Sequence, residues 1–198
     1  EPAIAQRIAD SIKDEAGVKR ILEIGPGTGI FTRALMAREE LELKLIEIDT
    51  ESVEHLHERH PELGDRIIEG DFLKMDLNTL VGGTPFILAG NYPYNISSQI
   101  LFRVVENPEL IPEMVGMFQK EVAMRIAEKP GSKVYGILSV LTQAFFDVEY
   151  LFTVPPNVFN PPPKVDSGVI RFTRKKDYSL PVNEKLFFRV VKMSLIQI

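Results

Sequence analysis

The residues of this sequence best suited to chemistry are Asn91, Tyr92, Pro93 and Tyr94, which follow the apolar run 86–90. Such a run predicts a buried parallel strand, and open α/β sheets bind ligands just beyond the carboxyl ends of their strands. The amide oxygen of Asn91 and one backbone carbonyl, that of Tyr92 or of Pro93, can accept both protons of an exocyclic amine. The ring of Tyr94 can stack on the attached heterocycle, a contact worth about 1–3 kcal/mol per base. Alone, the four residues favour a plain turn with a structural asparagine, so this interpretation depends on the rest of the chain.

A glycine-rich loop lies at 25–29, between a predicted strand and a predicted helix. Glycines let a backbone approach a ligand closely, and the N-terminus of the following helix offers unpaired N–H groups. The dinucleotide-binding fingerprint has its third glycine three residues after its second. Here Gly29 follows Gly27 by two residues, and an acid, Glu23, precedes Gly25 by two. This spacing is typical of S-adenosylmethionine-dependent methyltransferases, in which a compact loop wraps the methionine part of the cofactor.

Acidic residues follow the next two predicted strands. Glu47 lies about 20 residues beyond the glycine loop, where a carboxylate can accept hydrogen bonds from ribose hydroxyls. Asp49 alternates to the same face, but we expect it to cap the following helix instead. Asp71 can accept from an adenine amino group and the backbone N–H of Phe72 can serve a ring nitrogen, unless the two are simply a turn residue and a core residue. Acids at successive strand ends favour the cofactor interpretation.

Residue types argue against two other kinds of site. The chain has no cysteine, which excludes disulfides and thiolate chemistry and suits a reducing cytoplasm. His55, His57 and His60 fall on one predicted helix, but their spacing does not bring three imidazoles to one face. We therefore expect no metal site, and we expect these histidines to be solvated.

A proline-rich segment follows the predicted strand 148–154. Residues 155–163 include five prolines, which stiffen a loop that presents Phe159. A rigidly held aromatic ring can form the second wall of a slot for a planar base. A plain connector with Phe159 in the core is the alternative.

Charge is unevenly distributed over the 198 residues, whose net charge is −5. Residues 164–198 carry eight Lys/Arg against three Asp/Glu, while the remainder carries 15 against 25. A basic region on an acidic body can meet a phosphate backbone, although an ordinary solvated face explains the charges equally well. The sequence contains no apolar run of membrane-spanning length, and we expect neither a membrane span nor a signal peptide.

Hydrophobic periodicity predicts alternating strands and helices, with enough apolar residues, 44%, for one main domain and part of a second. The predicted helices are 3–12, 30–38, 50–60, 96–107, 119–128 and 137–146. The predicted strands are 20–24, 43–49, 66–69, 86–90, 114–118, 148–154 and 168–172.

Together these motifs resemble the ribosomal RNA adenine dimethyltransferases, most closely the KsgA type, which acts on small-subunit RNA. The resemblance covers nearly the whole chain and rests on the segments 23–29, 46–49, 70–71, 91–97, 119–122, 129–132 and 158–167. It implies a Rossmann-like class I methyltransferase with a seven-stranded, mostly parallel sheet, one antiparallel strand and flanking helices. It also implies a catalytic domain at 1–175 and the start of a small helical domain at 176–198.

The resemblance assigns roles by position. It implies that S-adenosylmethionine is bound by Glu23, Gly25, Gly27, Gly29, Glu47, Asp71, Phe72 and Asn91. It implies that the target adenine is held by Asn91, Pro93 and Tyr94, with Phe159 on its other side. The implied partner is small-subunit ribosomal RNA in a pre-ribosomal 30S particle, methylated in the cytoplasm by a monomer that needs no membrane.

The sequence departs from the family pattern in three places. Tyr92 stands where the family more often has an aliphatic residue. A preceding segment with a Gln-x-Phe-Leu motif, which covers the cofactor in the family, is not found, so we expect an incomplete cofactor site. After Ser194 the family continues into a basic run, whereas this sequence reads Leu195–Ile198, so we expect a truncated second domain.

Three alternatives remain. One is a large-subunit adenine dimethyltransferase that confers antibiotic resistance, although the long stretch 155–167 favours the small-subunit type. Another is a methyltransferase acting on a small molecule or on DNA. The third is a nucleic-acid-binding relative that keeps the fold without catalysis.

Overall fold

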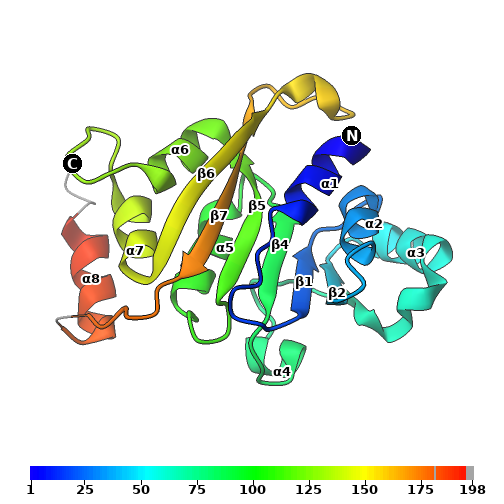
Figure 1. Cartoon of the computed structure of the whole chain (residues 1–198), viewed down its shortest axis with the longest axis horizontal. Helices are drawn as coiled ribbons and strands as arrows, with labels where there is room; N and C mark the ends of the chain where they lie inside the picture. The colour runs from blue at the N-terminus through cyan, green and yellow to red at the C-terminus, as the bar shows by residue number, and fades with distance from the viewer. Residues whose placement is uncertain (181, 195–198) are drawn as a thin grey trace.

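The computed structural model describes residues 1–180 and 182–194, and its centre is one seven-stranded sheet (Figure 1). The strand order is β3-β2-β1-β4-β5-β7-β6. The first five strands of this order pair in parallel, and β7 pairs antiparallel with both β5 and β6. The expected mostly parallel sheet with one antiparallel strand is therefore confirmed. The strands are β1 Arg20–Ile24, β2 Glu42–Glu47, β3 Ile67–Glu69, β4 Ile87–Asn91, β5 Glu113–Gln119, β6 Phe146–Val154 and β7 Ser167–Arg174.

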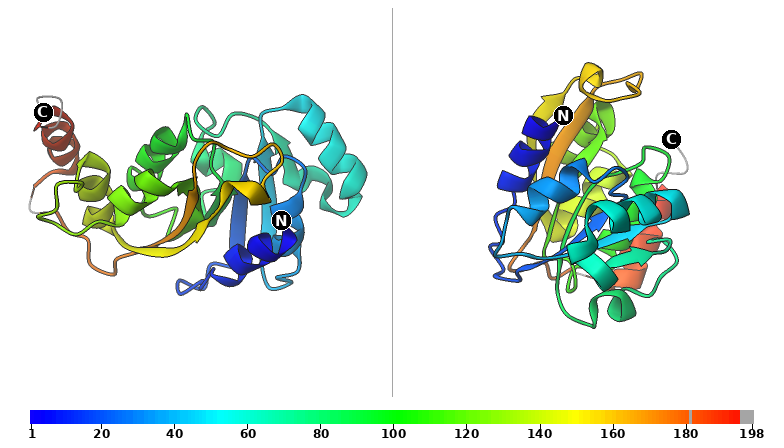
Figure 2. Two further views of the ribbon diagram at one scale, coloured as in Figure 1. Left: turned by 90° about the horizontal axis from the view of Figure 1, so that it is seen from above. Right: turned by 90° about the vertical axis from the view of Figure 1, so that its right-hand side faces the viewer.

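Helices cover both faces of the sheet (Figure 2). Neighbouring residues of one strand point to opposite faces, and here both faces are buried: Ile21 and Ile87 pack with α1, α2 and α3, whereas Leu22 and Leu88 pack with α4 to α7. This two-sided burial explains why the inner strands read as continuous apolar runs. The helices are α1 Pro2–Asp10, α2 Ile30–Met36, α3 Thr50–Arg59, α4 Leu77–Val81, α5 Ser97–Val105, α6 Lys120–Ala127, α7 Ile137–Phe145 and α8 Glu184–Ser194, with 3-10 turns η1 Pro61–Arg66 and η2 Pro156–Val158.

Three short elements were not predicted, namely α4, η1 and η2. Helix α4 has only five residues, too few for a helical period to show in the sequence. Its start is nevertheless encoded locally, because the carboxylate of Asp76 accepts a hydrogen bond from the N–H of Thr79 at 2.7 Å.

Asp49 and His60 flank helix α3 and can be compared with what the sequence predicted for them. Asp49 caps the helix, accepting from the N–H of Ser52 at 2.9 Å, as expected. His60 is not solvated, so that prediction is wrong: the helix ends at Arg59, the chain turns, and the imidazole is buried against the glycine loop. A Cβ added to Gly29 would lie 3.2 Å from His60 Nε2. Among the described residues, no group of three or more His, Asp or Glu is arranged to hold a metal ion.

Helix α8 packs on α7 at one end of the molecule, far from α3 (Figures 1 and 2). The ring of Phe188 stacks on that of Phe145 with centroids 5.8 Å apart, and Phe187 meets the same ring edge-on. The expected start of a second domain at 176–198 includes Leu195–Ile198, which lie outside the described residues, so this division stays a prediction. No helix in the described ranges has both the length and the apolar character needed to cross a membrane.

Candidate active site

Two cavities meet at the carboxyl end of β4. The first, of about 450 Å³, lies between the glycine loop, α1, the end of β5 and the proline-rich segment. The second, of about 320 Å³, is lined by the stretch 91–94 together with the proline-rich segment. Asn91, Phe159 and Pro161 line both cavities. The structure therefore brings together all four residues predicted to hold the target base, which are Asn91, Pro93, Tyr94 and Phe159.

The glycine loop shapes the first cavity with a backbone that only glycine adopts readily. Gly25, Gly27 and Gly29 have φ values of 63°, 52° and 77°. Gly25 and Gly27 line the cavity, and a Cβ added to either would meet no atom within 4 Å. Gly29 does not line it; this residue is the N-cap of α2 and packs against Leu56 and His60 instead.

Glu23 lines the first cavity from the end of β1, where its side chain is almost fully buried. Its Oε2 accepts a hydrogen bond from the hydroxyl of Thr32 at 2.8 Å. Burial raises the pKa of Glu23 to about 8; the Thr32 hydrogen bond opposes this rise, and the nearby charge of Glu47 adds to it. The raised pKa favours the protonated form of this carboxyl group at neutral pH.

Glu47 is buried behind the glycine loop and does not line the first cavity. Its Oε2 accepts from the N–H of Gly27 at 3.1 Å, and its Oε1 accepts from the N–H groups of Ile48 and Asp49 at 2.8 and 3.1 Å. The carboxylate thus ties the end of β2 to the loop. Since Oε2 makes only one of these bonds, it keeps capacity for a further donor, and its ribose role stays a prediction.

Asp71 and Phe72 lie outside both cavities. Asp71 Oδ1 accepts from the N–H of Leu73 at 2.9 Å, and Oδ2 lies 3.3 Å from the Lys74 ammonium. The ring of Phe72 is buried in the core beneath the guanidinium of Arg103. The two residues thus occupy the turn and core positions considered as alternatives, and their binding of adenine stays a prediction.

The turn after β4 fixes the orientation of the stretch 91–94, which is predicted to hold the target base. Asn91 is exposed at the strand end, and Tyr94 is half-buried with its hydroxyl 2.8 Å from Ser167 Oγ. The carbonyl of Pro93 accepts from the N–H of Ile96 at 3.1 Å. Since that bond uses one of the two lone pairs of the Pro93 oxygen, we take the carbonyl of Tyr92 as the better candidate for the second acceptor.

Tyr92, which we had noted only as a departure from the family, supports this strand end from within the core. Its ring is buried over the glycine pair Gly90 and Gly116, and its hydroxyl donates to the carbonyl of Val115 at 3.1 Å. Burial, with a smaller contribution from Glu23, raises the pKa of this phenol well above its ordinary value. Glycine in each of two apolar strands was the sequence signal that could have predicted a large ring packed over the sheet at this point.

Five further residues that line the first cavity were not predicted from the sequence. They are Ile4, Ala5 and Ile8 of α1, together with Phe31 and Met117. The helical spacing of Ile4 and Ile8 indicated a buried face but not what that face would cover.

Comparisons with known proteins agree with this geometry. The family model for ribosomal RNA adenine dimethylase matches residues 1–198. The ribosomal RNA small subunit methyltransferase A of Flavobacterium johnsoniae is 57% identical over 197 residues, which cover 100% of this chain and 75% of the relative. The same-named protein of Bacteroides thetaiotaomicron is 56% identical over 98% of this chain and 72% of its own length.

Solved structures give the same result. A dimethyladenosine transferase from Plasmodium falciparum superposes with a TM-score of 0.82 at 28% identity, covering 100% of this chain and 70% of that one. The 23S rRNA methyltransferase ErmE superposes with a TM-score of 0.79 at 25% identity, covering 100% and 78%. This chain belongs to the ribosomal RNA adenine dimethylase family of S-adenosylmethionine-dependent methyltransferases.

Proposed function

We propose that this protein transfers methyl groups from S-adenosylmethionine to the N6 atoms of adenosines in small-subunit ribosomal RNA, giving N6,N6-dimethyladenosine. The observation that carries the proposal is the junction of the two cavities at Asn91 and Phe159. An adenine in the smaller cavity presents its amine where the larger cavity opens. Relatives named for the small subunit are 54–57% identical to this chain, whereas ErmE, named for 23S RNA, is 25% identical.

The residues of the larger cavity fit S-adenosylmethionine. The open sides of Gly25 and Gly27 leave room for a ligand against the backbone, and the buried Glu23 offers a carboxyl group to the cationic part of the cofactor. Glu47, at the end of β2, accepts a bond from Gly27 of the cavity wall, and Asp71 follows β3, the parallel neighbour of β2; we assign them the ribose and the adenine. When bound, the cofactor supplies an electrophilic methyl group on a sulfonium.

The smaller cavity prepares the target amine. The N6 lone pair of adenine is delocalised into the ring and is a poor nucleophile. Acceptance of both N–H protons by Asn91 Oδ1 and the carbonyl of Tyr92 favours a pyramidal nitrogen with a localised lone pair. Tyr94 and Phe159 hold the ring between them, and the base must be unpaired or flipped to enter. Positioning therefore supplies most of the rate, and no strong general base is required.

The wider setting of the reaction is part of the same proposal. We assign the substrate to a pre-ribosomal 30S particle in the cytoplasm and the enzyme to a monomer with its catalytic domain at 1–175. Residues 176–198 begin the second, helical domain in this assignment. Co-sedimentation of the protein with subunit precursors, and its mass in solution, test these points separately from catalysis.

Methyl transfer is tested with labelled S-adenosylmethionine and under-methylated small subunits. Asn91→Ala should lower kcat by roughly 10²–10³-fold, as for loss of one donor from an oxyanion hole, while RNA affinity stays within about twofold. Asn95→Ala is the matched control, because Asn95 is exposed in the same turn but lines neither cavity.

Two results would contradict the proposal. If Asn91→Ala transferred methyl groups at nearly the wild-type rate, the role of Asn91 would be wrong. If the wild-type protein placed no label in the RNA, the non-catalytic binding function would be favoured instead.

A further inference from the structure

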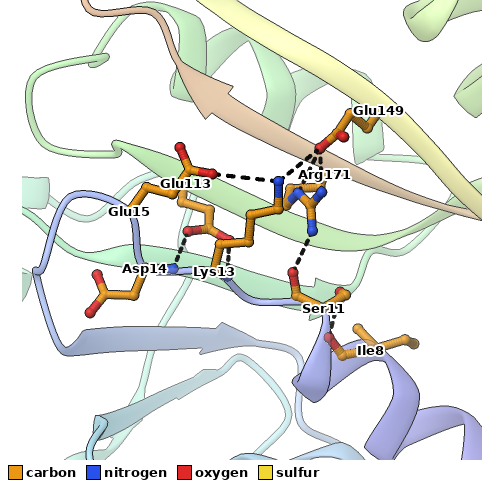
Figure 3. Close-up of polar contacts among 8 residues, drawn as sticks. All are labelled: Ile8, Ser11, Lys13, Asp14, Glu15, Glu113, Glu149 and Arg171. Atoms are coloured by element: carbon orange, nitrogen blue, oxygen red, sulfur yellow. Dashed lines mark hydrogen bonds and ion pairs between the residues drawn. The ribbon is translucent and has the colours of Figure 1, made fainter.

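The chain that leaves α1 is held by side chains from β5 and β7 (Figure 3). The guanidinium of Arg171, on β7, donates from Nη1 to the carbonyl of Ser11 at 2.7 Å. The carboxylate of Glu113, on β5, accepts from the N–H groups of Lys13 and Asp14 at 2.9 and 2.8 Å. We call Glu113 and Arg171 the α1 clasp.

Both side chains of the clasp are buried, and both make several hydrogen bonds. Glu113 and Arg171 are 3% and 7% exposed. Arg171 also donates through Nε to Glu149 of β6 at 2.9 Å, and a second bond to the same oxygen comes from its Nη2. Both oxygens of Glu113 are occupied by backbone donors. A buried charge stripped of such partners is strongly destabilising, so the clasp defines one position for the backbone of residues 11–14.

The clasped backbone adjoins the wall of the larger cavity. Ser11 donates to the carbonyl of Ile8 through both its N–H, at 3.0 Å, and its hydroxyl, at 2.6 Å. Ile8, Ala5 and Ile4 line the cavity. Fewer than one helical turn thus separates the clasp from the cavity wall.

Helix α1 depends on tertiary contacts for its position: its buried face packs against α2, and polar contacts hold its C-terminal end. It has nine residues, and isolated helices of that length are marginal in water. Arg171 brings a positive charge to its C-terminal carbonyls, where the helix dipole favours cations. Arg38, which follows α2, adds a bond to the carbonyl of Ala9 at 2.9 Å. These contacts fix the end of the helix from which Ile4, Ala5 and Ile8 line the larger cavity.

We propose that Glu113 and Arg171 are positioning residues for S-adenosylmethionine, setting α1 as one wall of its cavity without touching the cofactor. Neither side chain lines either cavity. The proposal rests on the assignment of the larger cavity to the cofactor under Proposed function. It predicts that loosening the clasp weakens cofactor binding and leaves the base-binding side of the site intact.

The test compares Arg171→Leu and Glu113→Gln with the matched control Arg174→Leu. Arg174 lies on the same strand and also donates to backbone carbonyls, those of Pro108 and Glu109 at 3.0 and 3.2 Å, but it does not contact α1. The Kd for S-adenosylmethionine is measured by calorimetry on folded protein, and kcat and KM are measured with small subunits. Arg171→Leu and Glu113→Gln should raise the Kd and KM for the cofactor roughly tenfold, with kcat at saturating cofactor within about twofold.

Arg174→Leu should lower the melting temperature without changing the cofactor Kd. Arg171→Lys, which can keep one bond to Ser11, should give an intermediate Kd. If Arg171→Leu does not fold, Arg171→Lys and Glu113→Gln decide the question. The proposal is overturned if folded clasp variants bind the cofactor within about twofold of wild type, or if the control weakens binding equally.

Failure of this inference is distinguishable from failure of the proposed function. A wild-type protein that binds S-adenosylmethionine but does not methylate subunits contradicts the methyl-transfer assignment. The cofactor Kd values of the clasp variants still decide whether the clasp positions α1.

Discussion

Replacing Gly116 by alanine should distort the strand end that carries Asn91. Gly116 of β5 lies opposite Gly90 of β4, and the ring of Tyr92 covers the pair. A Cβ added to Gly116 would lie 2.2 Å from the carbonyl oxygen of Gly90 and 2.4 Å from Tyr92 Cε2. The first neighbour is backbone and the second is a buried ring, so neither can move away without shifting β4.

The size of the effect follows from this geometry. Overpacking a core costs about 1–3 kcal/mol, and a clash with sheet backbone places Gly116→Ala at the upper end, about 3 kcal/mol. For a chain of this size that lowers the melting temperature by about 6–12 °C. Because Asn91 pairs with Met117 in the next register position, kcat should fall by roughly 10–100-fold, as expected for a reacting group displaced by up to about 1 Å.

Thermal unfolding and single-turnover methyl transfer measure the two effects. Gly90→Ala, whose added Cβ would lie 2.9 Å from the carbonyl of Ile24, should be less damaging than Gly116→Ala. Gly136→Ala is the control, since its φ is −140° and its added Cβ would meet nothing nearer than 3.8 Å; it should cost at most about 1 kcal/mol. A Gly116→Ala protein that lost less than about 1 kcal/mol and kept the wild-type rate would refute the reasoning.

Two further predictions concern Glu23 and Tyr94. Because the pKa of Glu23 is raised from 4.5 to about 8, the folded state keeps a proton that the unfolded state releases, and stability is lost as pH rises through this window. The free energy of unfolding of Glu23→Gln, measured with urea, should therefore rise relative to that of wild type by roughly 1.4 kcal/mol for each pH unit between 4.5 and about 8. Parallel pH profiles of the two proteins would contradict this. If the stability of the variant still falls as the pH rises, we assign that fall to Glu113, because burial also raises the pKa of this residue. Tyr94→Phe loses the bond to Ser167 but keeps the stacking ring, so kcat/KM for subunits should change less than about fivefold, whereas Tyr94→Ala should lose at least about tenfold; equal losses would assign the role to the hydroxyl.

Local pattern was sufficient for most of the architecture. Every strand was predicted within about three residues of its observed bounds, because two-sided burial makes inner strands continuous apolar runs. The compact spacing of Gly25, Gly27 and Gly29 distinguished this loop from dinucleotide-binding loops, and the observed positive φ values give the physical reason for glycine there. Asp49 was recognised as a cap from its position alone, since capping is satisfied within three residues.

Tertiary structure decided which groups meet. The sequence placed Asn91 and Phe159 on segments 68 residues apart, and only the folded sheet makes them neighbours in the same cavities. It likewise decided that His60 is buried against the glycine loop and that Glu47 is bonded to Gly27.

The amino-acid sequence by itself determined the order of the elements, the glycine loop and the turn at 91–94, because these depend on neighbours a few residues away. The clasp of Glu113 and Arg171 on the end of α1 joins residues about 100 and 160 positions apart. Such contacts depend on how whole strands pack against a helix, and no local period or motif encodes them.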